Sequence, residues 1–289
     1  MAGATVNGLY RLGRAAWYVF ALTALVACAS TTVSPGRCPD DRLALENCPP
    51  PGAVDDPGLN EWYRLRSADA ASEPDFDPTT KAIEAQISTQ QASAWLLGSS
   101  EGDALLSLAS KIYMVEQARH SVDAVYYIFK ADLAGKAMLG ALCNAVRRGV
   151  DVRLMVDSVG SISLDKTWLR ALHSCEVNGG FIRNSEGEVT TRRARAQVIL
   201  FNSLTKSPLT ANRRSHDKLL VVDGFADDRA RVMTGGRNIS LAYYGILADG
   251  SPNPDTYNDA ELLLRPAPDA DEEYNVAEVS VIYFTLLSL

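Results

Sequence analysis

The stretch Arg214-Ser215-His216-Asp217-Lys218-Leu219-Leu220-Val221-Val222-Asp223 decides how the rest of the chain is interpreted. His216 and Lys218 are two residues apart, so on a strand their side chains lie on the same face. The apolar run that follows, residues 219–222, is typical of a strand buried on both faces. A histidine and a lysine at the start of such a strand cost free energy unless they have a use. They are therefore candidate functional residues.

A second piece of the pattern follows the next apolar residues, Val232 and Met233. Gly235, Gly236 and Asn238 come directly after them. Small residues at such a point let an anion approach the backbone closely. The alternative interpretation is a chance His-Lys pair on a strand edge with an ordinary glycine turn after it.

The order His-x-Lys-x4-Asp and then Gly-Gly-x-Asn resembles the phospholipase D superfamily. The form Gly-Gly-Arg-Asn-Ile resembles its bacterial cardiolipin synthase and phospholipase D-like branch. Four upstream segments also match that branch in the same order: residues 102–105, 126–129, 132–135 and 148–153. The resemblance covers residues 82–280 and corresponds to the N-terminal half of a two-motif member.

The upstream residues predict alternating helices and strands. Apolar spacing predicts a helix over residues 103–119 and a strand over 121–129. A second helix over 133–148 ends at Gly149 and leads into a strand over 150–156. A strand–helix–strand unit of this length implies a parallel pair. The expected fold class is α/β: a mixed, largely parallel β-sheet flanked by helices, forming one phospholipase D-like half-domain.

The resemblance implies a reaction in which a histidine nitrogen displaces a phosphodiester and forms a phosphohistidine intermediate. The resemblance makes His216 either the nucleophile or the second histidine, which acts as general acid and base. It makes Lys218 the ligand of a non-bridging phosphate oxygen. Asp223 completes the catalytic set and orients the motif. The substrate-binding residues that the resemblance implies are Gly235, Gly236 and Asn238. It implies no metal ion or other cofactor.

Two further features bear on the site. The branch normally carries two copies of the motif, and this chain has one; His120 and His173 are interpreted as structural or solvated. The chain is then either half of a symmetric homodimer or a truncated product, and the abrupt change of pattern near its end favours the second. Asp259, at the start of a predicted strand, either supports a catalytic group or caps the strand.

The N-terminal residues predict export. Residues 1–28 resemble a signal peptide of the lipoprotein type, because a short apolar run ends in Leu25-Val26-Ala27-Cys28. Cys28 would be lipidated and would anchor the protein to a bacterial membrane on the periplasmic side. The alternatives are an uncleaved anchor helix and a secretory signal that is cut elsewhere.

Residues 29–81 are expected to form a tether and N-terminal preamble, because they are rich in Ser, Thr, Pro and Gly. Cys38 and Cys48 could close a disulfide in an oxidising compartment, or remain free thiols. Cys143 and Cys175 are interpreted as buried small hydrophobic residues. The catalytic domain is expected over residues 82–280, and residues 281–289 are a divergent apolar tail.

The overall composition narrows the function. A formal net charge of −7 argues against a nucleic-acid surface, which is usually basic. The leading prediction is therefore phospholipid phosphodiester transfer or hydrolysis of the phospholipase D or cardiolipin synthase type, with a membrane phospholipid as substrate. The alternatives are a phospholipase D-type nuclease and a catalytically inactive lipid-binding lipoprotein.

Overall fold

The computed structural model describes residues 48–67, 92–161, 164, 166–202, 214–226, 228–267 and 275–288. The chain divides into two units, Met1–Cys48 and Pro49–Leu289. Every helix and strand among the described residues belongs to the second unit. The predicted lipidation site Cys28 and the predicted disulfide partner Cys38 lie outside the described residues. Cys48 takes part in a disulfide, and its pairing with Cys38 stays a prediction.

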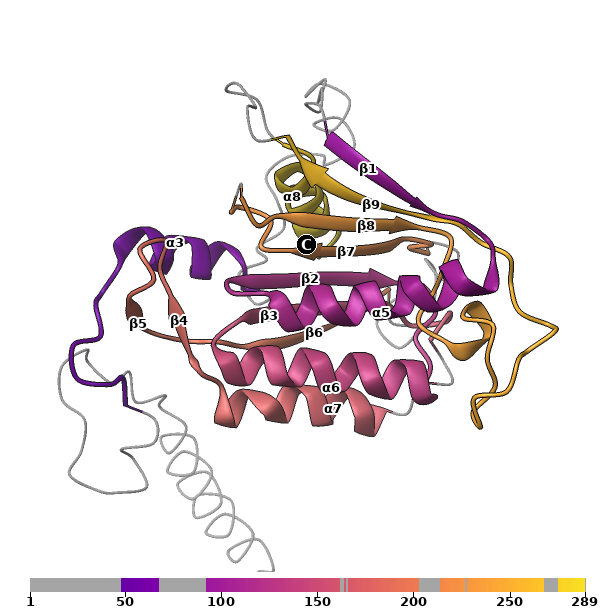
Figure 1. Ribbon diagram of the computed structural model, residues 1–289. Coiled ribbons are helices and arrows are strands. Elements are labelled where there is room, and N and C mark those ends of the chain that lie inside the picture. The colour runs from indigo at the N-terminus through magenta and orange to yellow at the C-terminus, as the bar shows by residue number, and fades with distance from the viewer. Residues whose placement is uncertain are drawn as a thin grey trace, which may run out of the picture. The chain divides into compact units, whose positions relative to one another are not determined.

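The centre of the second unit is a seven-stranded sheet with the order β1-β9-β8-β7-β2-β3-β6 (Figure 1). Its strands are β1 (Ala92–Leu97), β2 (Ser121–Tyr126), β3 (Asp151–Asp157), β6 (Ala196–Phe201), β7 (Lys218–Val222), β8 (Arg231–Gly235) and β9 (Glu261–Pro266). A separate hairpin pairs β4 (Phe181–Arg183) with β5 (Val189–Arg193).

The sheet confirms the predicted α/β class with a mixed sheet and flanking helices, but its parallel share is smaller than expected. Only the β2–β3 and β3–β6 pairs are parallel. The β2–β7, β7–β8, β8–β9 and β1–β9 pairs are antiparallel. A helical crossover joins β2 to β3, whereas a short loop joins β7 to β8, and short loops favour antiparallel neighbours.

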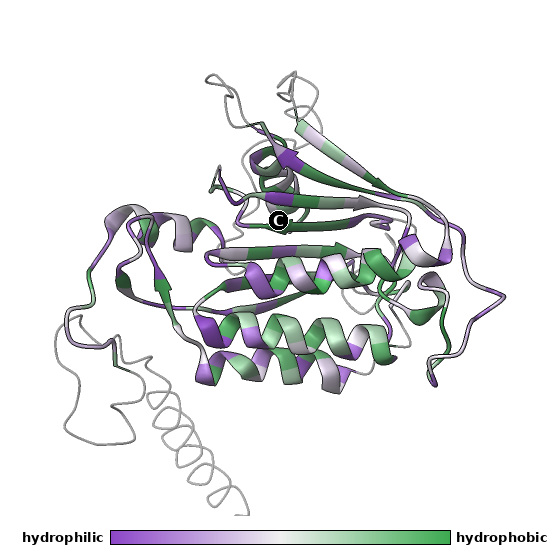
Figure 2. Ribbon diagram, viewed as in Figure 1, coloured by the Kyte–Doolittle hydropathy of each residue, from purple (hydrophilic) through white to green (hydrophobic). Residues whose placement is uncertain are grey.

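Helices cover both faces of the sheet. They are α3 (Pro57–Leu65), α5 (Glu101–Gln117), α6 (Leu133–Arg148), α7 (Lys166–Ser174) and α8 (Val276–Ser288). Alternate residues of β2 point to opposite faces: Val122 and Ala124 pack with α5 and α6, whereas Val125 packs with α8. The central strands are coloured largely as hydrophobic in Figure 2, whereas α5 and α6 mix both colours, as expected for elements with one face in the core.

Helix α6 begins and ends at the residues that the sequence predicts. Asp132 precedes it and accepts a hydrogen bond from the Gly135 backbone N–H at 3.1 Å, which satisfies one of the free donors of the first turn. Gly149 follows it with φ 98°, a left-handed conformation that glycine adopts without strain. The segment Asp132-to-Gly135 therefore fixes the start of the helix beside the end of β2.

The structure extends the folded body beyond the predicted domain limits at both ends. Helix α3 lies within the predicted tether, and the buried Arg66 that follows it bonds Asp123 at 2.7 Å and Asp151 at 2.9 Å. At the other end, Val281 of the predicted tail is buried in α8 against the sheet. Sequence composition did not reveal that these two segments pack on the folded body. The ion pairs of Arg66 join residues 57 and 85 positions apart, and such contacts have no local signature in the sequence.

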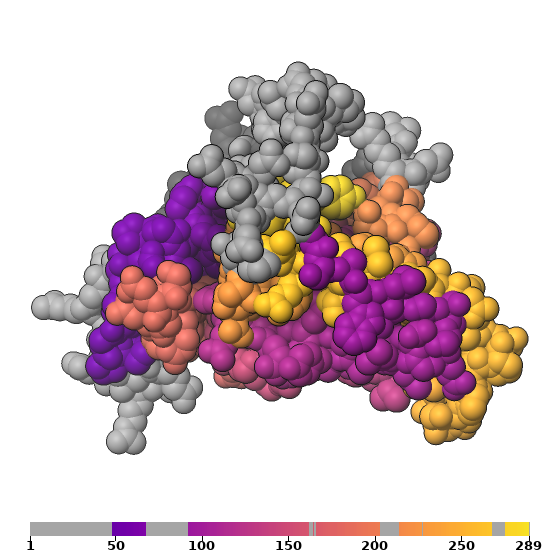
Figure 3. All heavy atoms as spheres, turned by 45° about the horizontal axis from the view of Figure 1, so that its top comes forward, coloured from indigo at the N-terminus to yellow at the C-terminus, as the bar shows by residue number. Residues whose placement is uncertain are grey.

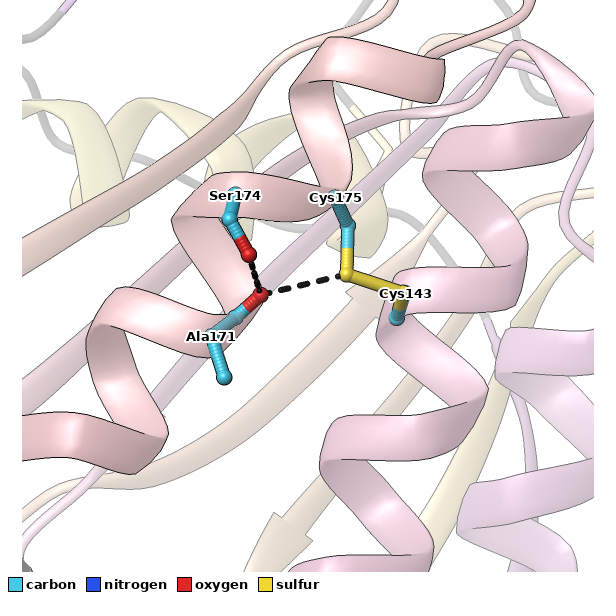
Figure 4. The surroundings of a disulfide bond; sticks show 4 residues. All are labelled: Cys143, Ala171, Ser174 and Cys175. Atoms are coloured by element: carbon cyan, nitrogen blue, oxygen red, sulfur yellow. Dashed lines mark hydrogen bonds between the residues drawn. A yellow bond between two sulfur atoms is a disulfide. The ribbon is translucent and has the colours of Figure 1, made fainter.

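Cys143 and Cys175 form a disulfide, which corrects their interpretation as buried free cysteines (Figure 4). Their Cα atoms lie 5.5 Å apart, and both residues are half-buried. The bond joins α6 to the turn after α7, 32 residues later in the chain. Contact between these two elements is a tertiary property, so sequence spacing alone could not predict it.

None of the helices in the described part of the chain has the length and apolar character needed to cross a membrane.

Candidate functional site

Several strands begin or end on the same side of the sheet, and their termini form an edge that runs across the strand direction. β2 and β8 end there, and β7 and β9 begin there. The register fixes this meeting, because Tyr126 pairs with Lys218, and Gly235 pairs with Glu261. His216 lies just before β7, so its side chain emerges at the same edge. Chain segments far apart in sequence thus form one small surface around the His-x-Lys pair.

His216 and Lys218 contact each other closely. The His216 ring is exposed and packs on Tyr127, with ring centroids 4.6 Å apart and planes tilted by 54°. The Nζ atom of Lys218 lies 3.2 Å from Nδ1 and 3.3 Å from Nε2 of that ring, and it donates to the His216 carbonyl oxygen at 2.7 Å. The imidazole is therefore open to solvent, held by an aromatic ring, and adjacent to an amino group.

Lys218 carries its charge in a partly desolvated setting. Its residue is only 6% exposed, and burial lowers the pKa of its amino group. Asp217 and Asp259 oppose this shift through their negative charges. A cation that is already stripped of water interacts strongly with charge that develops on a neighbouring phosphate.

Asp217 links the motif to the last helix. Its side chain accepts a hydrogen bond from the Ser215 hydroxyl and another, at 3.0 Å, from the Tyr283 hydroxyl of α8. Burial and the nearby Asp217 carboxylate raise the pKa of Tyr283 to about 12, so the hydroxyl stays protonated and donates. The backbone between His216 and Lys218 is therefore held from the opposite face of the sheet.

Asp223 lies away from this edge, at the far end of β7. It comes five positions after Lys218, which is about 16 Å along a strand. Its buried carboxylate accepts backbone N–H groups of Arg119 (3.1 Å), His120 (2.7 Å) and Ser121 (3.1 Å). The structure therefore does not bring Asp223 into contact with the His-x-Lys pair. Its hydrogen bonds instead hold the end of β7 against the start of β2.

Gly235 and Gly236 are needed for close packing with β9. A Cβ atom on Gly235 would lie 2.4 Å from the Ala260 carbonyl oxygen, and one on Gly236 would lie 2.2 Å from Oδ1 of Asp259. The Gly236 N–H donates to the Ala260 carbonyl at 2.9 Å. This amide is thus committed to the sheet, which departs from the expectation that the Gly235-Gly236 backbone donates to a phosphate.

Asn238 is buried and ties three segments of the site together. Its Oδ1 accepts from the Ile128 N–H at 2.8 Å, and its Nδ2 donates to the Tyr243 hydroxyl at 2.8 Å. The Tyr243 ring lies 4.8 Å from the ring of Tyr257. An amide NH₂ group has two hydrogens, and the bond to Tyr243 uses one of them. Asn238 therefore positions the wall of the site, and its second amide hydrogen has no partner among the described residues.

Asp259 lies beside Gly236 at this edge, and its support of a catalytic group stays a prediction. It contacts Gly236 across the close approach of β8 and β9, and its charge acts on Lys218 and Tyr243. The residues that the sequence did not single out are Tyr127, Tyr243 and Tyr283. Tyr127 directly follows β2 and so lies at the edge where that strand ends, a signal that the sequence does contain.

A buried ionic cluster lies beside this edge. Lys111 of α5 pairs with Glu261 of β9 at 2.6 Å, and the Ser107 hydroxyl also bonds Glu261. Burial lowers the pKa of Lys111 to about 8, against the opposing effect of Glu261. Arg237, between Gly236 and Asn238, adds a further charge 3.7 Å from Glu261. The cluster fastens α5 and the glycine-containing segment to β9.

The part of the chain that the structure describes contains no group of three or more His, Cys, Asp or Glu side chains that could hold a metal ion. The chemistry available at this edge is an exposed imidazole, a partly desolvated ammonium group, carboxylates and tyrosine hydroxyls.

Known proteins share this pattern over about the same residues. Residues 112–244 match the family model described as "Cardiolipin synthase, PLD-like domain". Cardiolipin synthase C of Escherichia coli is 32% identical over 149 residues, which make up 48% of this chain and 26% of that protein. Cardiolipin synthase 1 of Bacillus cereus is 29% identical over 133 residues, 45% of this chain and 21% of that protein. This chain thus spans a minor part of the length of these relatives.

A solved structure with a similar arrangement is Nuc from Salmonella typhimurium, a phospholipase D family member. It is 20% identical, with a TM-score of 0.39 over 67% of this chain and 92% of that chain.

Proposed function

We propose that the chain supplies a half-site for phosphodiester transfer or hydrolysis on a phospholipid, because residues 112–244 match the model of the cardiolipin synthase-type, phospholipase D-like domain. The observation that carries the proposal is the contact of Lys218 Nζ with both ring nitrogens of the exposed His216. A nucleophile and a cation for the phosphate oxygens stand side by side, as displacement at phosphorus requires.

In the proposed first step, a ring nitrogen of His216 attacks phosphorus. A P–N bond forms and the P–O bond to the headgroup alcohol breaks. The alcohol leaves with a proton from an acid on the opposite side of phosphorus. In the second step, the same group, now a base, takes the proton of water or of an acceptor alcohol; the oxygen attacks phosphorus, the P–N bond breaks and its electron pair returns to the ring. Lys218 stabilises the negative charge on the non-bridging oxygens in both steps.

The acid on the opposite side of phosphorus needs a second group. Among the described residues, His120 lies at the other end of β2 and His173 lies on α7, so neither reaches His216. A second imidazole would come from a second copy of this chain, in a symmetric contact, or from a further phospholipase D-like half. Asp223 transfers no proton in this mechanism, since it is about 16 Å from Lys218.

We further propose export and anchoring at Cys28 on the periplasmic side of a bacterial membrane, which would keep the site close to its lipid. The Cys143–Cys175 disulfide supports this location, because disulfides persist in oxidising compartments.

The test is turnover by the purified chain of labelled phosphatidylglycerol, phosphatidylethanolamine and DNA, over a range of protein concentrations. The proposal predicts turnover of a phospholipid, lost in His216→Ala and retained in His173→Ala, whose side chain is 70% exposed. A specific rate that rises with protein concentration would indicate a second copy. Turnover of DNA alone, or phospholipid turnover that survives His216→Ala, would contradict it.

A further inference from the structure

A cavity of about 640 Å³ lies at the edge of the sheet opposite to His216. It lies between the first turn of α3, the junction of α5 and β2, the β4–β5 hairpin and the loop after β7. Figure 3 shows α3 in indigo beside that hairpin in salmon. Asp223, which lines the cavity, is about 16 Å along β7 from Lys218, so this cavity is separate from the catalytic edge.

Three guanidinium groups reach this cavity, and each has unused hydrogen-bond donors. The Nε atom of Arg229 is buried without a hydrogen-bond partner among the described residues, and it lies 3.7 Å from a carboxylate oxygen of Asp223. Arg183 donates from Nη1 to the neutral Gly187 carbonyl at 2.7 Å. The Arg119 guanidinium makes no hydrogen bond or ion pair with the part of the chain that the structure describes. A buried donor without a partner indicates an absent acceptor.

The acids that line the cavity are largely committed elsewhere. Asp56 caps α3 by accepting the Leu59 N–H at 2.9 Å. Asp223 accepts three backbone N–H groups at the start of β2. Asp228 is exposed, and is the remaining carboxylate among the lining residues. Arg119 and Arg183 therefore face one free carboxylate, that of Asp228, whereas the charge of Arg229 is paired with Asp223.

The remaining walls are apolar. Leu59 and Trp62 of α3 line one side, and Phe225, which is 47% exposed, lines another. The volume is within the range of pockets that take small organic ligands. A bare inorganic ion would leave these side chains in water, whereas a ligand with an apolar part would cover them.

We propose that this cavity binds a phosphate group that carries an apolar substituent. Guanidinium groups suit phosphate because they donate two parallel hydrogen bonds to its oxygens. Such a group occurs in the headgroup region of an acidic phospholipid and in a soluble phosphate ester. The site does not depend on catalysis at His216, because it lies at the other edge of the sheet.

The test is calorimetric titration of the full chain with three probes: dihexanoyl phosphatidylglycerol below its micelle concentration, dihexanoyl phosphatidylcholine, and phenyl phosphate. The variant is Arg119→Ala with Arg183→Ala, because both side chains are exposed and their removal leaves the core intact. Arg170→Ala, an exposed arginine on α7, is the matched control.

We expect phosphatidylglycerol or phenyl phosphate to bind the chain and the control alike, and about tenfold or more weaker to the double variant. Binding of phosphatidylglycerol alone assigns a lipid, and binding of phenyl phosphate alone assigns a soluble ester. The proposal is overturned if no anionic probe binds, if phosphatidylcholine binds equally well, or if binding persists unchanged in the double variant; loss of binding in Lys218→Ala would then assign the probe to the site at His216.

Discussion

Asp223 offers a sharp test of how the His-x-Lys-x4-Asp motif divides its work. Its carboxylate is 2% exposed and accepts N–H groups at 3.1, 2.7 and 3.1 Å. Its backbone has φ 51°, a left-handed conformation that Asp and Asn adopt more readily than other side chains. Asp223→Asn therefore keeps the size and the backbone preference and removes the charge.

The expected loss follows from those three bonds. A hydrogen bond to a charged group contributes about 1.5–3 kcal/mol, and a neutral one about 0.5–1.5 kcal/mol. Losing the charge at three bonds thus lowers the free energy of unfolding by about 3 kcal/mol. Asp223→Ala leaves three N–H donors without an acceptor and places alanine at a positive φ, so the loss rises to about 5 kcal/mol.

Urea denaturation measures this loss, and turnover per folded molecule is measured on the same samples. Asp228→Asn is the matched control, since Asp228 lies exposed in the same loop, and it should change stability by about 0.5 kcal/mol or less. A structural role for Asp223 is contradicted if Asp223→Asn unfolds like the unchanged protein but has lost its turnover. That result would place Asp223 in the chemistry.

Three further predictions concern other parts of the fold. Reducing the Cys143–Cys175 disulfide, which closes a loop of 32 residues, should lower the free energy of unfolding by about 2–4 kcal/mol. Burial lowers the pKa of Lys111 from 10.5 to about 8, so between these pH values the unfolded chain binds more protons than the folded chain. The free energy of unfolding should therefore rise from pH 8 to pH 10.5, and Lys111→Met should remove this rise. Tyr283→Phe removes the hydrogen bond to Asp217 and should slow turnover about fivefold, while stability changes by less than about 1 kcal/mol.

Each of these has its own control or contradiction. The double serine variant of the two cysteines should match the reduced protein, and a fully stable variant would contradict the first. Parallel pH profiles of Lys111→Met and the unchanged chain would contradict the second. For the third, Tyr113→Phe is the control because that tyrosine is 65% exposed on α5; equal rates in both tyrosine variants would remove Tyr283 from the support of the site.

The sequence predicted the parts of the fold that depend on local pattern. Helix α6 was predicted with both ends from its apolar spacing and from Gly149, which is a local signal for a helix end. The buried strand β7 was predicted from its apolar run. The antiparallel half of the sheet was underestimated, because pairing between β1 and β9 joins residues that lie more than 150 positions apart.

In the candidate site, too, local pattern could be predicted from the sequence and long-range contacts could not. His216 and Lys218 were predicted together from their spacing, and the structure places them in contact. The structure assigns the two glycines to packing against β9. The motif alone could not reveal this role, because it does not show that Ala260 and Asp259 occupy the space where Cβ atoms would stand. Tyr283 could not be predicted, since only the fold of α8 brings it to Asp217.

The proposed mechanism depends on a covalent bond between His216 and phosphorus. The direct measurement is rapid mixing with a phospholipid labelled in its phosphate, an alkaline quench that preserves phosphohistidine, and mass spectrometry of the peptides. We expect a phosphatidyl adduct on a ring nitrogen of His216, absent in His216→Ala and present in His173→Ala. Phospholipid turnover without any adduct on His216, or an adduct on another residue, would contradict it.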